Sequence, residues 1–236
     1  MTSRRPLSPV VLLGLLIAGG FLISLVPSPA VLWTTRLSPA TFHIVHDGYQ
    51  FALGFGVFYA AKRLSRAPLP RLVGGATVKS LVLAVGLGIA CGFGHRAIAA
   101  AAENIGNSFP EFRESWPWLF SPQIRIGGLK GPSISGWIEI AISSGLTSFA
   151  EELIFRGVIL WLILRLTRNP TIAIAISAVW FGGLHWRAGF VSVISAGAVA
   201  GVATGWLALR TRSVVCAGLL HWVTNLTIYF LVLATR

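Results

Sequence analysis

The sequence predicts an all-α protein, a polytopic integral membrane helical bundle of about seven transmembrane helices within a range of roughly six to eight. Two observations on composition support this fold class. Hydrophobic residues make up 55% of the 236 residues, and charged residues make up only 11%. A soluble domain carries about 25% charged residues, so this chain cannot cover a solvated surface of ordinary size. The third observation is a series of apolar runs of about 20 residues, the length at which a helix crosses a bilayer.

The composition also excludes other classes of protein. Its high hydrophobicity excludes a disordered chain, and its two cysteines, both inside apolar runs, exclude a disulfide framework. In a soluble protein the net charge of +12 would suggest a nucleic-acid partner. Here most basic residues stand at the ends of apolar runs, where the positive-inside rule places them. We therefore expect the lipid bilayer as a partner and no nucleic acid.

The apolar segments follow one another along the chain, at roughly 8–26, 40–61, 76–102, 137–166, 171–186, 190–209 and 213–234. The first follows Arg4 and Arg5 and resembles a signal peptide, but the segments after it favour a retained signal anchor. At 1.5 Å per residue, segment 137–166 would reach about 45 Å, against about 30 Å of hydrocarbon. It is predicted to tilt, to extend beyond the membrane, or to break near Ser143-Ser144-Gly145. Segment 171–186 is short for a span, so we expect it either to cross with little tilt or to join a re-entrant element.

The basic residues orient the predicted bundle. They are more numerous on the side that holds the N-terminus, where they include Arg4, Arg5, Lys62, Arg63 and Arg66. The positive-inside rule then predicts a cytoplasmic N-terminus. The only sizeable non-membrane piece is the loop 103–132, which holds two tryptophans and is predicted to lie as an interfacial cap on the outer surface.

Ionisable residues at membrane depth are costly, and each is a functional hypothesis. Glu152 and Arg156 stand four residues apart, on one helix face at salt-bridge spacing. Glu151 is rotated from Glu152 by about 100°. The arginine can neutralise one carboxylate while the other points elsewhere, so we expect Glu151 to have a purpose beyond structure. The alternative is a bundle held together by buried charges.

Two further polar patterns stand on later segments. Phe181 and His185 share a face with two glycines between them, and His221 and Asn225 share a face on the last segment. Each pattern alone is weak, because a buried histidine is more often a structural one. Together, a spare carboxylate, two imidazoles and an amide can activate water and hold an oxyanion. Peptide hydrolysis inside the membrane uses all four groups.

The order EExxxR, FxxxH, HxxxN across residues 137–230 resembles the CPBP family, the CAAX-protease and bacteriocin-processing intramembrane proteases, also called the Abi family. The resemblance implies that residues 131–236 form a catalytic helical core within a single membrane domain. Residues 1–130 would supply N-terminal transmembrane helices and the outer loop. It further implies an integral protein of the bacterial inner membrane with a membrane-anchored protein or peptide substrate.

The resemblance also implies roles for the residues of the three patterns. Glu151 would activate the attacking water, and His185 would help to hold that water. His221 and Asn225 would stabilise the oxyanion, so that these four residues form the catalytic set. The structural support would come from Arg156 acting through Glu152 and from the packing of Phe181.

The sequence does not decide whether the protein needs a metal ion or which substrate it cleaves. The family is often described as metalloproteases, and Glu151, His185 and His221 could hold a catalytic zinc. The compact H-E-x-x-H pattern is absent, and Asn225 is a better oxyanion donor than zinc ligand, so we expect a glutamate mechanism without a cofactor. The known substrates include prenylated proteins, bacteriocin precursors and sorting tails, and nothing in the chain selects among them.

The sequence leaves two rival functions, and the first of them rests on residues outside the three patterns. His43, His46, Asp47 and Arg96 could form a proton or cation path through a transporter or channel. They could equally lie near the lipid head groups. A transporter usually shows paired repeats, and the sequence shows none. The second rival is a catalytically silent binding protein with the same fold.

Overall fold

The computed structural model describes residues 39–65, 72, 74–120 and 133–234, together with Ser8, Val10, Val11 and Gly14. The first predicted segment, 8–26, lies outside this part apart from those positions. The helices, in chain order, are α3 Pro39–Ser65, α4 Val78–Ser108, α5 Pro110–Ser115, α6 Pro117–Phe120, α7 Ile134–Ile154, the π-helix η1 Phe155–Ile159, α8 Leu160–Thr167, α9 Pro170–Leu184, the 3-10 helix η2 Trp186–Ala188, α10 Phe190–Ile194, the π-helix η3 Ser195–Gly201, α11 Val202–Thr211 and α12 Val214–Ala234.

The all-α membrane fold class is confirmed. The described ranges contain helices and no strand, and each predicted segment from the second onwards coincides with helical structure. Within the part of the chain that the structure describes, three helical stretches are long and apolar enough to cross a bilayer, namely α4, the continuous run Phe190–Thr211, and α12. The count of about seven spans stays a prediction.

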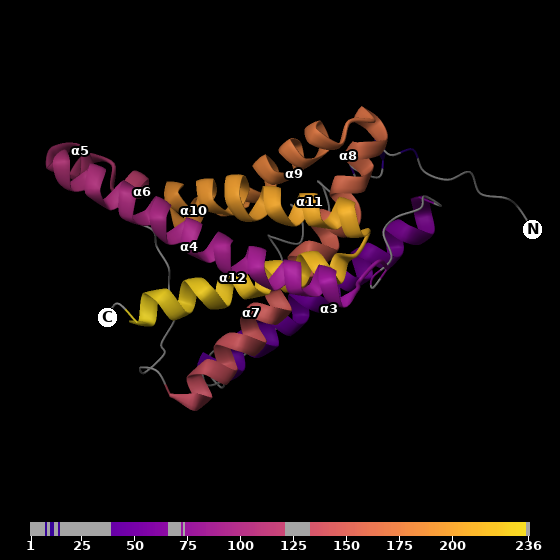
Figure 1. The fold of residues 1–236 in the computed structure, drawn as a ribbon, viewed down its shortest axis with the longest axis horizontal. Coiled ribbons are helices and arrows are strands. Elements are labelled where there is room, and N and C mark those ends of the chain that lie inside the picture. The colour runs from indigo at the N-terminus through magenta and orange to yellow at the C-terminus, as the bar shows by residue number, and fades with distance from the viewer. Residues whose placement is uncertain are drawn as a thin grey trace, which may run out of the picture.

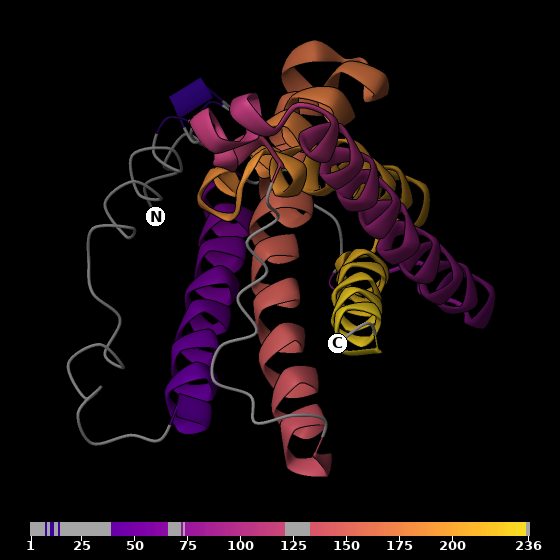
Figure 2. The same ribbon diagram turned by 90° about the vertical axis from the view of Figure 1, so that its left-hand side faces the viewer.

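Four long helices lie side by side in the order α3, α7, α12, α4 (Figure 2). Above this row lie α8, α9 and the run α10–η3–α11 (Figure 1). Glycines allow α4 to approach α12 closely. A Cβ atom at Gly88 would lie 2.6 Å from the carbonyl oxygen of Leu220, and one at Gly92 would lie 2.5 Å from Cβ of Thr227.

Of the three alternatives for segment 137–166, the break at Ser143-Ser144-Gly145 is wrong. α7 continues through these residues to Ile154, and the irregular turn comes later, at η1. The small residues serve close packing between helices instead. Ser143 donates a hydrogen bond to the carboxylate of Asp47 on α3, and a Cβ atom at Gly145 would lie 3.3 Å from Nε1 of Trp222. The π-helix is a local widening of the helix, of the kind often found at functional sites.

The reversal from α8 to α9 is set by local sequence. Arg168 takes the left-handed conformation with φ 53° and ends α8. The Asn169 side chain accepts hydrogen bonds from the backbone N–H groups of Thr171 and Ile172 at the start of α9. Pro170 occupies the first helical turn, where it needs no N–H partner. This turn directs α9 back over α8.

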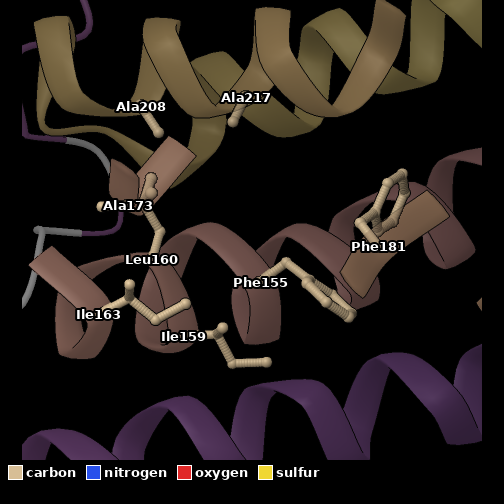
Figure 3. Close-up of a cluster of buried hydrophobic side chains, with 8 residues drawn as sticks. All are labelled: Phe155, Ile159, Leu160, Ile163, Ala173, Phe181, Ala208 and Ala217. Atoms are coloured by element: carbon tan, nitrogen blue, oxygen red, sulfur yellow. The ribbon is translucent and has the colours of Figure 1, made fainter. Parts of the chain in front are cut away.

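An apolar cluster joins the upper helices to α12 (Figure 3). Its buried members are Phe155, Ile159, Leu160, Ile163, Ala173, Phe181, Ala208 and Ala217. Phe155 and Phe181 meet edge to face with ring centroids 5.1 Å apart, a favoured aromatic geometry. This cluster fixes Phe181, and with it the end of α9.

The predicted outer cap is partly helical. α4 extends to Ser108, and α5 and α6 follow as short helices that each begin with a proline. Trp116 and Trp118 are exposed. Nε1 of Trp118 donates a hydrogen bond to the carbonyl oxygen of Trp186, at 2.7 Å. The cap therefore contacts the turn that follows α9.

Candidate active site

A cavity of about 270 Å³ lies among α4, α7, α9, η3 and α12. The residues of the three sequence patterns that line it are Glu151, Phe181, His185, His221 and Asn225. They come from three helices that are far apart in the sequence. The structure thus brings together all four residues expected to be catalytic, while their roles stay predictions.

The Glu152–Arg156 pair lies beside the cavity and is fully buried. Nε of Arg156 lies 3.2 Å from Oε2 of Glu152, and both side chains are 0% exposed. Nη2 of Arg156 donates a hydrogen bond to the carbonyl oxygen of Gly201 at 3.0 Å. The guanidinium carbon stands 4.6 Å from the ring centroid of Phe181, a cation–π distance. Arg156 therefore joins η1 to α9 and η3.

His221 lies between the two glutamates. Its Nδ1 is 3.1 Å from Oε1 of Glu152, and its Nε2 is 3.9 Å from Oε2 of Glu151. A carboxylate paired with arginine can only accept, so Nδ1 carries the proton of this hydrogen bond. In the neutral ring, Nε2 then presents its lone pair on the side of Glu151. The sequence predicted the Glu152–Arg156 pair but not this contact.

His185 caps the end of α9. Its backbone leaves the helix at φ −86° and ψ 9°, and its Nδ1 lies 3.0 Å from the carbonyl oxygen of Phe181. A carbonyl accepts only, so Nδ1 again carries the proton and Nε2 is the remaining acceptor. The Phe181 ring meets both imidazoles edge to face, with centroids 4.9 Å from His185 and 5.5 Å from His221. The packing expected of Phe181 is thus seen against both histidines.

Asn225 and Glu151 complete the polar lining. Nδ2 of Asn225 donates a hydrogen bond to Oγ of the buried Ser148 at 3.0 Å, which orients the amide and leaves its second hydrogen available. The Glu151 side chain is 31% exposed, whereas that of Glu152 is 0% exposed. The two adjacent carboxylates therefore occupy different environments, as their angular separation on the helix predicts.

Among the residues of the rival transporter path that the structure describes, His46, Asp47 and Arg96 do not line this cavity. Asp47 accepts the hydrogen bond from Ser143, and Nε2 of His46 lies 2.9 Å from the side chain of Gln50. The side chain of His43 lies outside the described residues. Arg96 stands on α4, but it is the preceding residue, His95, that lines the cavity.

His95 and Ser195 are cavity residues that sequence reasoning missed. Nδ1 of His95 lies 2.7 Å from Oγ of Ser195. A buried histidine in segment 76–102 could have been noticed as a costly polar group. No signal in the sequence marks Ser195, because serine is common in membrane helices and its partner is 100 residues away.

Glu151, His185 and His221 are residues of the types that bind zinc, but their side chains are not grouped closely enough in space to hold the ion. His185 and His221 both give their Nδ1–H to protein acceptors and keep Nε2, an arrangement typical of metal-bound histidines. Within the described ranges, however, no three His, Cys, Asp or Glu side chains are grouped closely enough to hold a metal ion. As placed here, the side chains therefore do not fit a metal ion.

The fold and the site define a class: a helical membrane protein whose bundle encloses a cavity lined by carboxylate, imidazole and amide groups. Residues 133–227 of this protein match a family model. The model is described as "Rce1-like: Type II CAAX prenyl endopeptidase Rce1-like". The matched span holds all three sequence patterns, so the resemblance to the CAAX-protease family is confirmed over that span. No curated protein and no solved structure matches the chain. α3 and α4, with His95, lie outside the matched span.

Proposed function

We propose that this protein is an intramembrane endopeptidase that hydrolyses a peptide bond of a membrane-associated protein or peptide. The family description of residues 133–227 supports the reaction class. The observation that carries the proposal is the position of Glu151. Its carboxylate lines a cavity inside the bundle, lies 3.9 Å from an imidazole nitrogen, and is not the carboxylate that pairs with Arg156.

Glu151 acts as the general base. It takes a proton from a water in the cavity, and the water oxygen forms a bond to the carbonyl carbon of the peptide. Nε2 of His185 accepts the second hydrogen bond of this water and orients it. When the tetrahedral intermediate collapses, the C–N bond breaks and Glu151 returns the proton to the leaving amine. The carboxylate is unchanged after one turnover.

Asn225 is the neutral donor to the oxyanion. Its second amide hydrogen is available, and its orientation is fixed by Ser148. His221 donates from Nε2 only as the imidazolium, because its Nδ1–H is given to Glu152. In that form the His221 ring adds a second donor beside Asn225 as negative charge develops on the substrate oxygen. Arg156 and Glu152 act through His221 and hold its ring in place.

The test is the substitution Glu151→Gln in the full-length protein reconstituted in detergent or liposomes. The probe is a quenched ten-residue peptide with a prenylated cysteine followed by three residues. We expect turnover to fall by about 10² to 10⁴, the usual contribution of a general base, with thermal unfolding unchanged. Glu139→Gln is the matched control, because Glu139 stands on the same helix and does not line the cavity. Full activity in Glu151→Gln would refute the assignment.

A further inference from the structure

His95 is a buried ionisable residue that the proposed reaction does not use. It stands on α4, is 6% exposed, and lines the same cavity as Glu151. Because it lies outside residues 133–227, it belongs to the part of the chain that adds to the matched core. A buried histidine needs partners for both ring nitrogens, since an unmet polar atom is costly.

The hydrogen bonds around His95 fix the direction of its proton. Oγ of Ser195 donates to the carbonyl oxygen of Ser192 at 3.3 Å. A hydroxyl has one hydrogen, so Oγ of Ser195 accepts from Nδ1–H of His95 at 2.7 Å. Nε2 of His95 then carries a lone pair, and it is a buried atom with no hydrogen-bond partner among the described groups. It is an acceptor suited to a donor brought by a ligand.

The position of His95 along the bundle follows from the packing of α4 on α12. Gly88 meets Leu220 and Val223, and Gly92 meets Thr224 and Thr227, so both helices advance in the same direction. Counting onwards by the same number of residues along both helices puts residue 95 of α4 level with about residue 228 of α12. Residue 228 also lines the cavity. Residue 228 lies seven positions after His221 (228 − 221), about 10 Å along a helix axis. An extended peptide covers that distance in about three residues.

We propose that His95 and Ser195 form a substrate-binding subsite that accepts a backbone N–H of the peptide, about three residues from the scissile bond. The subsite rests on the proposed endopeptidase function. An extended peptide presents N–H groups regularly, whatever its side chains. The neighbouring lining residues Ala188, Ala196 and Ala200 have no side-chain acceptor for them. Nε2 of His95 supplies that acceptor.

The experiment measures binding of the prenylated ten-residue peptide to full-length Glu151→Gln protein, which cannot consume it. A series of peptides replaces each non-scissile amide in turn by an ester, which removes one N–H. Each is measured with His95 intact, with His95→Asn and with His95→Gln. Asparagine keeps a donor near the position of Nδ1 but has no group at the position of Nε2, whereas glutamine places an amide oxygen there.

With His95 intact, we expect one ester to weaken binding about three- to tenfold, the value of a single hydrogen bond. His95→Asn should weaken the parent peptide by a similar factor and abolish the penalty of that ester alone. His95→Gln should restore the penalty, which a purely structural role of His95 would not do. Equal binding in His95→Asn, or an unchanged ester profile, would overturn the subsite.

Turnover by the protein with Glu151 intact is measured in parallel and tests the endopeptidase function separately. Binding with the expected ester profile but without cleavage would refute the reaction and keep the subsite. Cleavage with no response to His95 would refute the subsite alone. Thermal unfolding of each variant confirms that the protein is folded.

Discussion

Arg156 is the residue on which most of the polar network depends. It pairs with Glu152, donates to Gly201, and stands over the ring of Phe181, all at 0% exposure. Glu152 in turn accepts from His221. Removing the guanidinium therefore leaves a buried carboxylate without its main counter-charge, and such a change costs about 3–5 kcal/mol.

We expect Arg156→Ala to lower the melting temperature by about 6 °C or more, at roughly 2–4 °C per kcal/mol for a chain of this size. Arg156→Lys should recover part of the loss, because an ammonium supplies the charge but not the forked contact to Glu152 and Gly201. Tryptophan fluorescence during heating in detergent measures both. Arg165→Ala, at an exposed position of α8, is the control; an equal drop there would contradict a specific role for the buried pair.

A second prediction at the scale of single residues concerns the amide of Asn225. Loss of one oxyanion donor typically costs about 10²–10³ in kcat, so Asn225→Ala should lower kcat by about a hundredfold or more with KM nearly unchanged. Ser148→Ala, which removes only the group that orients the amide, should have a smaller effect on kcat. Steady-state kinetics on the quenched peptide distinguishes the two. A rise in KM at constant kcat would assign Asn225 to substrate binding.

At the scale of elements, the contact of α4 with α12 decides whether the N-terminal helices reach the cavity. Gly92 has no room for a side chain, since a Cβ atom would lie 2.5 Å from Thr227 Cβ. A Cβ atom at Gly86, on the same helix, would meet no atom of another helix within 4 Å. These two glycines offer a matched pair of sites.

Gly92→Ala should destabilise the protein by about 1–3 kcal/mol, the usual cost of overpacking, and should also weaken peptide binding, because it moves α4 and His95 away. Gly86→Ala should leave stability and binding unchanged or slightly improved, since alanine favours the helix. The melting temperature and the peptide affinity of both variants test this. If Gly92→Ala behaved like Gly86→Ala, the close approach of the two helices would be wrong.

At the scale of the whole molecule, the metal question is settled by one measurement. We expect activity to survive extensive treatment with a strong chelator, because the proposed mechanism takes its base and its oxyanion donors from side chains alone. Metal content and peptide cleavage are measured on the same chelated sample. Loss of cleavage that zinc alone restores would reassign Glu151, His185 and His221 as ligands.

The integral membrane character rests on the apolar helices and the family match. The bacterial inner membrane, the cytoplasmic N-terminus and the division at residue 130 stay predictions. So does the number of spans, because most of the first apolar segment lies outside the described residues.

Three features follow from the amino-acid sequence alone: the helical class, the apolar segments and the pairs that share a helix face. Glu152 with Arg156 is such a pair, because residues four apart are neighbours on any α-helix. Composition and spacing are local properties, and a lipid environment leaves the backbone almost no alternative to helix. These features therefore followed from counting residues.

Which helix faces meet is a property of the folded bundle and does not follow from the sequence. His221 contacts Glu152 across 69 residues, and His95 contacts Ser195 across 100. The close approach of α4 to α12, the π-helix at Phe155–Ile159 and the reversal at Arg168 place these side chains around one cavity. The rotation of a helix about its axis and its choice of neighbour depend on many small packing contacts summed over the bundle. The spacing of residues within one segment therefore does not predict which helix faces meet.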